Sequence, residues 1–170
     1  MLELENTKTN VILNLRNQRR VYILMSILFK GKESPLSNLY ILEQGLIYKD
    51  TLFNCSEQAY QWEKCMFYNN LNLAEKILKE KNPYKQMRLG GLIEGDIEWT
   101  NAKIFYMTEI LKIKLINSKA YRDALKYSKD NLLIEDTCHE FWGRGKTGNG
   151  KNNLGVLHCS LRALSKICET

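Results

Sequence analysis

The sequence has little proline and histidine and no long apolar run. Only two prolines and two histidines occur among its 170 residues. No stretch approaches the ~18 consecutive apolar residues that a membrane-spanning helix needs. The N-terminal segment MLELENTKTN is acidic and polar, which is not the pattern of a signal peptide. We therefore expect a cytoplasmic protein that makes no contact with a membrane.

The five cysteines do not form the pattern of a disulfide framework, because their number is odd and no C-x-x-C occurs. Cys138 precedes His139, and His158 precedes Cys159, which raises the question of a zinc site. Neighbouring residues on a strand or helix point in different directions, so such pairs rarely bind one metal ion. We expect buried thiols and ordinary histidines, with no metal ion and no cofactor.

The length and composition are those of one globular domain, with 44% apolar and 26% charged residues. The net charge of +6 permits a polyanionic partner such as nucleic acid. The lysines are scattered along the chain, however, so the charge alone does not identify that partner. Residues 1–20 are mainly polar and are predicted to be an extension or a loosely attached helix. Residues 21–170 are predicted to form the domain, and nothing in the sequence indicates an oligomeric state.

The hydrophobic pattern predicts an α+β domain that is mostly helical, with a small β-sheet near its N-terminal side. A strand is expected over 21–29, and a hairpin over 39–53 with its reversal at Gly45. Asn54 or Ser56 can cap the first helix. NLLIE, residues 131–135, indicates a short strand or a buried connector. Helices are predicted over 56–70, 71–82, 84–93, 97–116, 119–128 and 152–168.

A glycine-rich segment, GKTGNGKNNLG, runs from Gly145 to Gly155 and has the G-x-x-x-x-G-K spacing of a nucleotide-binding loop. Asn152 stands where a Ser or Thr would hold magnesium, and only about fifteen residues follow, too few for a βαβ sheet. An NTPase is therefore disfavoured. The glycines could let the backbone approach a ligand, with the helix that begins near Asn152 and Asn153 donating its amides. The alternative is a plain turn capped by Asn.

One face of the first predicted helix is polar, at positions i, i+3, i+4 and i+7. It consists of Glu57, Tyr60, Gln61 and Lys64. A second face, which consists of Ala59, Trp62 and Met66, is expected to anchor the helix in the core. The polar face is either solvated surface or a set of ligand contacts. Trp99 and Trp142 are either core residues or platforms on which a base or sugar stacks.

Several separated motifs occur in the order typical of one family. They are SNLY (37–40), SEQAYQWEK (56–64), W-x-x-x-K (99–103), LLIEDTCHEFWGRG (132–145), GNGKNNLG (148–155) and Arg162. Over about residues 29–164 the chain thereby resembles the NADAR family, which includes the YbiA-like proteins. It departs from the family pattern at His139-Glu140, where Asp is usual, and at Leu39, where Phe is commoner.

The resemblance implies a compact, largely helical domain that cleaves N-glycosidic bonds. Two activities are associated with the family: removal of ADP-ribose from guanine in nucleic acid, and hydrolysis of ribosylamino-pyrimidine intermediates of riboflavin synthesis. The partner would be an ADP-ribosylated guanine nucleotide or nucleic acid, or a ribosylated small metabolite. A non-catalytic module that binds ADP-ribose or a nucleotide is the alternative, and a structural DNA-binding protein ranks last.

Breaking a ribose–nitrogen bond requires a carboxylate near the anomeric carbon and a proton donor for the leaving nitrogen. Glu57 and Glu135 are the carboxylate candidates. Lys64 is either a desolvated nucleophile that forms a Schiff base or a point charge on a diphosphate. The expected substrate contacts are Asn38, Tyr60, Gln61, Trp99, Trp142, Gly143, Gly150, Asn152, Asn153 and Gly155.

Overall fold

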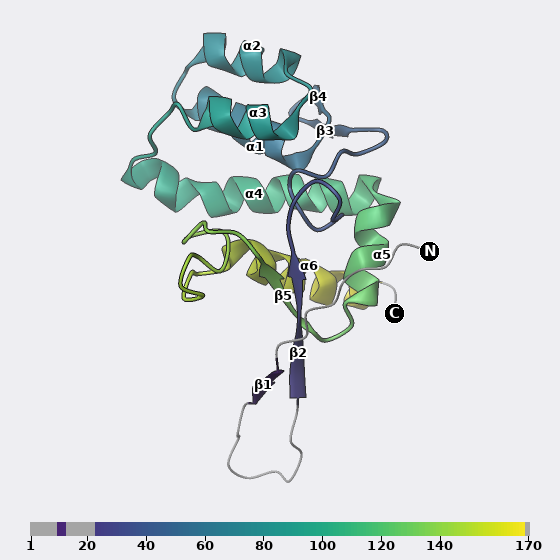
Figure 1. Cartoon of the computed structure of the whole chain (residues 1–170). Helices are drawn as coiled ribbons and strands as arrows, with labels where there is room; N and C mark the ends of the chain where they lie inside the picture. Colours follow the sequence, from purple (N-terminus) through teal and green to yellow (C-terminus); the bar gives the residue numbers. More distant parts are fainter. Residues whose placement is uncertain (1–9, 13–22, 169–170) are drawn as a thin grey trace. The chain divides into compact units, whose positions relative to one another are not determined.

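The structure is a computed structural model that describes residues 10–12 and 23–168 (Figure 1). The chain divides into two compact units, residues 31–122 and residues 1–30 with 123–170. The described residues form six helices and five short strands, so the predicted mostly helical α+β class is confirmed. Most of residues 1–20 lie outside the described part. Within them Asn10–Ile12 is strand β1, where the helical interpretation is wrong.

The unit of residues 31–122 is built around helix α1 (Ser56–Phe67). This helix packs against α2 (Leu71–Lys79), α3 (Pro83–Gly90) and α4 (Ile97–Asn117) (Figure 1). The α1–α2 contact encloses a small apolar cluster of Cys65, Leu73, Ala74 and Ile77. Asn70 and Asn82 cap α2 and α3, and Pro83 occupies the first turn of α3, where its missing N–H costs nothing.

The hairpin of β3 (Leu46–Tyr48) and β4 (Thr51–Phe53) reverses at Lys49 and Asp50, so the predicted reversal at Gly45 is wrong. Both turn residues have positive φ angles, 48° and 59°. A two-residue turn of this kind matches the twist of the strands that it joins. Gly45, with a φ of 66°, lies before β3, where a Cβ would collide with the carbonyl oxygen of Phe53.

The cap of α1 is Cys55, so the prediction of Asn54 or Ser56 is wrong. The Cys55 Sγ accepts the backbone N–H of Gln58 at 3.4 Å, which is the hydrogen bond that a Ser or Asn cap would make. The Asn54 side chain instead donates to the carbonyl of Lys81 at 3.0 Å. Ser56 is already the first residue of the helix.

The second unit contains a three-stranded sheet in the order β1-β2-β5. The central strand β2 (Ile23–Phe29) pairs antiparallel with β1 and parallel with β5 (Leu132–Glu135). Helix α6 (Asn153–Cys168) packs against β5. The sheet is therefore only partly N-terminal, because one of its strands follows the whole helical unit in sequence. Helix α5 (Lys119–Tyr127) connects the two units.

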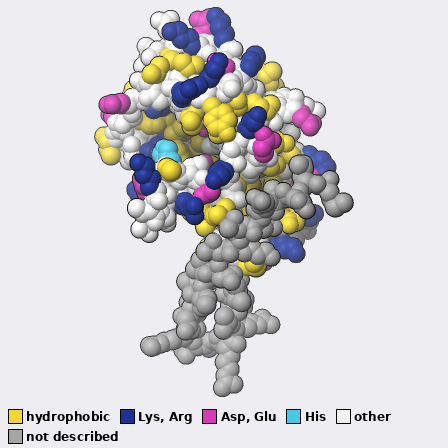
Figure 2. Space-filling model, in the orientation of Figure 1, with side chains coloured by type: hydrophobic (Ala, Val, Ile, Leu, Met, Phe, Trp, Pro, Cys, Tyr) yellow, Lys and Arg dark blue, Asp and Glu magenta, His cyan; other side chains and the backbone are white. Residues whose placement is uncertain are grey.

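On the face shown in Figure 2, Lys and Arg side chains are interspersed with acidic and apolar ones. Within the described part of the chain, no helix combines the length and the apolar character that crossing a membrane requires.

Candidate functional site

The polar face of α1 is buried, so the solvated-surface interpretation is wrong for most of it. Glu57 and Gln61 are each 8% exposed, and Tyr60 is buried beside them. Lys64, one turn further along, is half-buried. The prediction that Met66 helps to anchor α1 in the core is also wrong. Its side chain is 38% exposed, whereas the neighbouring Cys65 is part of the apolar core.

Glu57 and Gln61 form a hydrogen-bonded pair. The Gln61 Nε2 donates to Glu57 Oε1 at 2.8 Å, and the backbone N–H of Glu57 donates to the carbonyl of Asn38 at 3.0 Å. Burial raises the pKa of the Glu57 carboxyl, and the bond from Gln61 opposes this only in part. Glu57 therefore keeps its proton to a higher pH than an ordinary glutamate, which suits a group that donates and accepts protons.

Lys64 makes two hydrogen bonds that the sequence does not predict. Its Nζ donates to the carbonyls of Gly90 at 3.3 Å and Ile93 at 2.5 Å, at the C-terminal end of α3. Burial lowers the pKa of this amine. Gly90 also lies against Gln61, and a Cβ at Gly90 would overlap the Gln61 amide. The end of α3 thus fits closely against the polar face of α1.

Tyr60 and Trp99 contact each other, with ring centroids 5.5 Å apart. Trp99 also stacks on Tyr106 at 5.7 Å and is 3% exposed, so it is a core residue of this unit. The side chain of Asp96 caps α4 by accepting the backbone N–H of Trp99 at 2.9 Å. The aromatic cluster therefore forms a rigid support beside Tyr60.

Two of the predicted substrate contacts in this unit have a buried side-chain oxygen without a hydrogen-bond partner among the described residues. They are Asn38 Oδ1 and Gln61 Oε1. The Asn38 Nδ2 donates weakly to the sulfur of Met107 at 3.4 Å, which fixes the direction of its amide. Buried polar atoms without partners are rare in native proteins and call for an explanation. Both oxygens belong to predicted substrate-contact residues, and the Gln61 oxygen lies against Gly90.

The glycine-rich segment folds onto itself instead of presenting its amides. The backbone N–H groups of Gly150 and Asn152 donate to the carbonyls of Arg144 at 2.7 Å and Gly143 at 2.9 Å. The N–H groups at the start of α6, of Asn153 and Leu154, donate to the carbonyls of Phe141 at 3.3 Å and Trp142 at 3.1 Å. The expectation that the first amides of α6 point at a ligand is therefore wrong for these two residues.

The glycines serve the same internal packing. A Cβ at Gly143 would overlap Thr137, and a Cβ at Gly150 would overlap the backbone between Gly143 and Gly145. A Cβ at Gly155 would overlap the carbonyl oxygen of Leu133 in β5. The backbone approaches that these glycines allow are therefore contacts within the protein.

Asn152, the residue that departs from the nucleotide-binding pattern, completes the edge of β5. Its Oδ1 accepts the N–H of Glu135 at 2.9 Å, and its Nδ2 donates to the carbonyl of Leu133 at 2.9 Å. Its φ of 49° directs the side chain there. The neighbouring Asn153 donates to the carbonyl of Phe141 at 2.8 Å. Both amides predicted to contact substrate thus make structural hydrogen bonds.

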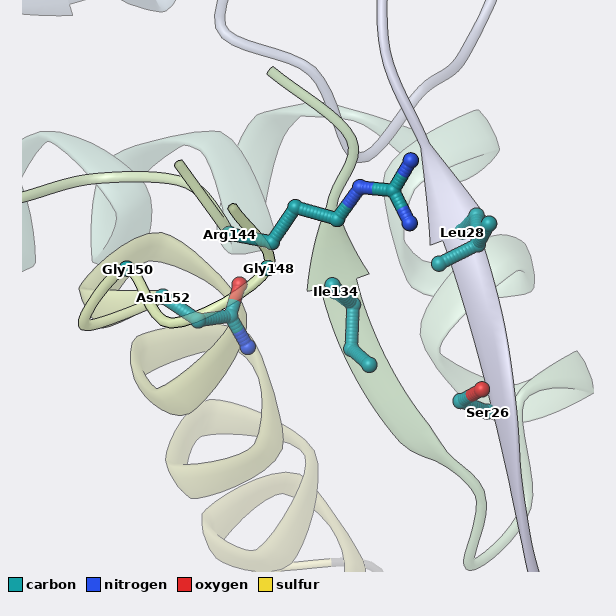
Figure 3. A pocket seen from close by; sticks show the side chains of 7 residues that line it. All are labelled: Ser26, Leu28, Ile134, Arg144, Gly148, Gly150 and Asn152. Atoms are coloured by element: carbon teal, nitrogen blue, oxygen red, sulfur yellow. The ribbon is translucent and has the colours of Figure 1, made fainter. Parts of the chain in front are cut away.

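A pocket of about 200 Å³ lies between the glycine-rich segment and the sheet (Figure 3). Leu28 of β2 and Ile134 of β5 supply an apolar wall, and Arg144 extends toward Leu28. The Arg144 Nε is held by Asp136 at 2.6 Å, and Asp136 also binds Lys30 at 2.7 Å. The hydrogen bond from Lys30 is the main reason that the pKa of Asp136 is lowered. The pocket combines an apolar wall with a fixed cation.

The predicted site residues fall into two sets, one in each unit. The unit of residues 31–122 brings together Asn38, Glu57, Tyr60, Gln61, Lys64 and Trp99. The other unit contains Glu135, Trp142, Gly143, Gly150, Asn152, Asn153 and Gly155. Glu135 is half-buried at the end of β5, and Trp142 is buried against Phe141 with centroids 4.9 Å apart. Among the described residues, no three His, Cys, Asp or Glu side chains gather as metal ligands would.

Two charged residues with notable positions in the structure are not among the predicted site residues. Arg144 lies within the LLIEDTCHEFWGRG motif, and the pattern of that motif gives it no separate role. Lys114 is fully buried in α4, on the stripe that also carries Trp99, Met107 and Ile110. The helical spacing of these apolar residues places Lys114 on the core face. That spacing was therefore a signal in the sequence for an unusual buried lysine.

The fold and the motifs together define the class of protein. The chain matches the NADAR domain over residues 28–164 and belongs to that family. The NMR structure of the E. coli protein YbiA superposes with a TM-score of 0.70 at 24% sequence identity, covering 84% of this chain and 86% of YbiA.

Curated relatives are named for riboflavin biosynthesis. The chloroplastic riboflavin biosynthesis protein PYRR of Zea mays is 27% identical over 117 residues, which are 63% of this chain and 19% of the maize protein. A riboflavin biosynthesis protein of Vibrio vulnificus is 26% identical over 115 residues, covering 66% of this chain and 30% of its own length. The chain thus spans less than a third of the length of these relatives.

Proposed function

We propose that the protein is an N-glycosidase that removes ADP-ribose from guanine in nucleic acid. The reaction adds one water across the bond: the oxygen goes to the anomeric carbon, and a proton goes to the guanine nitrogen. The observation that carries this proposal is the buried Glu57 carboxyl, which Gln61 holds in place beside Tyr60. A buried carboxyl with a raised pKa is the proton donor that a leaving nitrogen requires.

The surroundings of Glu57 support a polar, nucleotide-like substrate. Asn38 and Gln61 each direct an oxygen that the described residues leave without a hydrogen-bond partner. Ribose hydroxyls and the amino groups of a base are donors of the kind that these oxygens accept. A buried site of this composition would orient a ligand through a few fixed polar contacts.

The second candidate is hydrolysis of a ribosylamino-pyrimidine, an intermediate of riboflavin synthesis. It is favoured by the names of the maize and Vibrio relatives, both of which are riboflavin biosynthesis proteins. The bond that breaks is again between a ribose carbon and a nitrogen, so Glu57 would have the same role. The net charge of +6 favours the polyanionic substrate over this small metabolite.

The test is a comparison of substrates with purified full-length protein. We would incubate it separately with guanine-ADP-ribosylated DNA, the corresponding RNA and a ribosylamino-pyrimidine, and identify the products by mass spectrometry. Release of ADP-ribose with recovery of unmodified guanine supports the proposal. Turnover of the pyrimidine alone selects the second candidate. Binding of ADP-ribose without turnover of any substrate would overturn both and leave a binding module.

Within this function we propose Lys64 as the nucleophile. Its Nζ would attack the anomeric carbon as guanine leaves with the proton from Glu57, and opening of the ribose ring would give a Schiff base. Water then adds to the imine carbon, the amine leaves, and the released ADP-ribose closes its ring. The lowered pKa of the half-buried amine supports this role, because only the neutral form attacks.

Reduction with cyanoborohydride during turnover is expected to leave a stable adduct on the peptide that contains Lys64, detected by mass spectrometry. Lys64→Arg is the decisive variant, since arginine can still donate to the carbonyls of Gly90 and Ile93 but cannot form the imine. We expect it to lose turnover and labelling. An active Arg variant without an adduct would restrict Lys64 to holding the end of α3.

A further inference from the structure

Lys114 is a fully buried lysine in the middle of α4. Its relative exposure is 0%, the same as that of Ile110 one turn before it. Removing an ammonium from water costs several kcal/mol unless its hydrogen bonds are replaced, and an apolar side chain of similar size often packs at no cost in stability. A methionine or leucine would therefore serve the core at least as well as this lysine does.

The contacts of Lys114 are few and specific. Its Nζ donates to the carbonyl oxygen of Ser37 at 2.8 Å and lies 4.8 Å from the centre of the Tyr121 ring. The first contact reaches across 77 positions of sequence, from α4 to the segment that precedes the β3–β4 hairpin. The amine thus fixes one particular peptide group.

That peptide group joins Ser37 to Asn38, and both ends of the pair are held. α4 holds the pair at two points: the Lys114 Nζ donates to the backbone carbonyl of Ser37, and the side-chain Nδ2 of Asn38 donates to the sulfur of Met107. α1 holds the following peptide group, because the backbone N–H of Glu57 donates to the Asn38 carbonyl at 3.0 Å. The Asn38 Oδ1, buried and without a partner among the described residues, is therefore oriented by contacts from both helices.

We propose that Lys114 is a positioning residue, which holds the Ser37 carbonyl so that the Asn38 side chain keeps a fixed register against Glu57. It touches no substrate and acts through Asn38. This inference rests on the proposed function, because it assigns Asn38 and Glu57 to one site. It accounts for a buried amine where an apolar residue would be the less costly choice.

Ionisation of the Lys114 amine is expected to make the stability of the protein depend on pH. Burial lowers the pKa of Lys114 to about 7 from 10.5. The titratable groups that face it are the Cys55 thiol on the N-terminal side of α1 and the Tyr121 phenol on α5. Burial raises the pKa of both, to about 12 for Cys55, so neither ionises near neutral pH. Between pH 7 and 10.5 the unfolded chain binds the extra proton, so stability rises with pH across that window.

The experiment compares Lys114→Met with Lys112→Met in the full chain. Lys112 is an exposed lysine two residues earlier on the same helix, paired with Glu109. We expect Lys114→Met to lower kcat about 100-fold through misplacement of Asn38, with KM unchanged. Its stability at pH 7 should match or exceed that of the wild type, and its pH-dependence above pH 7 should flatten. Lys112→Met should resemble the wild type. Unchanged kcat in Lys114→Met, or parallel loss of stability and activity, would overturn the proposal.

A readout without turnover separates this inference from the proposed function. The side-chain amide of Asn38, assigned by its disappearance in Asn38→Asp, is followed by ¹⁵N NMR. Its signals should shift in Lys114→Met and stay in place in Lys112→Met even if wild-type protein cleaves neither substrate. If Lys114→Met does not fold, a pH titration of wild-type protein provides the test. The NMR signals of the Asn38 side-chain amide should then shift around pH 7, where the Lys114 amine ionises. If the Asn38 side-chain signals change neither on Lys114→Met substitution nor during the pH titration, the positioning role is overturned.

Discussion

Replacing Glu57 with glutamine is expected to slow glycosidic cleavage by about 10²–10⁴-fold, the usual contribution of a positioned acid or base. Glutamine has nearly the same shape and can still accept the N–H of Gln61, but it can neither donate the proton to the leaving nitrogen nor recover it. The measurement is kcat on guanine-ADP-ribosylated oligonucleotide. The control is Glu75→Gln, which neutralises an exposed glutamate of the same unit. Full turnover in Glu57→Gln would remove Glu57 from the mechanism.

The same variant should not be less stable than the wild type at neutral pH. Because burial raises the pKa of Glu57, the folded state binds its proton more tightly than the unfolded state. The stability that this group contributes is complete below its unfolded pKa of 4.5 and is lost as pH rises through the folded pKa. Glutamine does not ionise, so the variant does not lose this stability as the pH rises. Urea unfolding at acidic and neutral pH should therefore show a smaller decrease with pH in the variant, and an unchanged decrease would contradict the assignment.

Replacing Gly155 with alanine is expected to lower the free energy of unfolding by about 1–3 kcal/mol, the usual effect of overpacking a filled site. The added methyl group would overlap the Leu133 carbonyl and the amide of Asn152, which together form the edge of β5. For a chain of this length the melting temperature should fall by about 2–4 °C per kcal/mol. Thermal and urea unfolding measure the effect.

The matched control is Val156→Ala, which removes an exposed side chain at the next position of the same helix. It should change the melting temperature little, because surface substitutions away from special features are usually within about ±0.5 kcal/mol. Equal stability of Gly155→Ala and the wild type would show that α6 can move away from β5 without cost, contrary to the close contact described above.

Elements that depend on local sequence could be predicted. The long helix α4 and the last helix α6 follow from apolar residues at helical spacing. The hairpin reversal could not be placed, because Lys49 and Asp50 adopt positive φ angles that usually mark glycine or asparagine. The Cys55 cap could not be predicted for a similar reason, because a thiol rarely takes the place of a hydroxyl or amide at the N-cap of a helix.

Burial is where the sequence of α1 was ambiguous. Spacing shows that Glu57 and Gln61 share a face, but it does not show whether other parts of the chain cover that face. The glycine-rich segment is the converse case. Its glycines correctly indicated close backbone approach, but whether the approaching group is a ligand or the protein itself depends on distant segments such as β5. Both ambiguities concern contacts between residues far apart in sequence, which periodicity does not encode.

The parallel pairing of β2 with β5 has a consequence for synthesis of the chain. A ribosome releases β2 first and then the whole of residues 31–122 before β5 emerges. Throughout that interval the nascent β2, ILMSILF, is apolar and lacks one of its two neighbours. An unpaired apolar strand readily associates with other chains. Translation speed across the helical segment therefore sets how long a newly made molecule is vulnerable to aggregation.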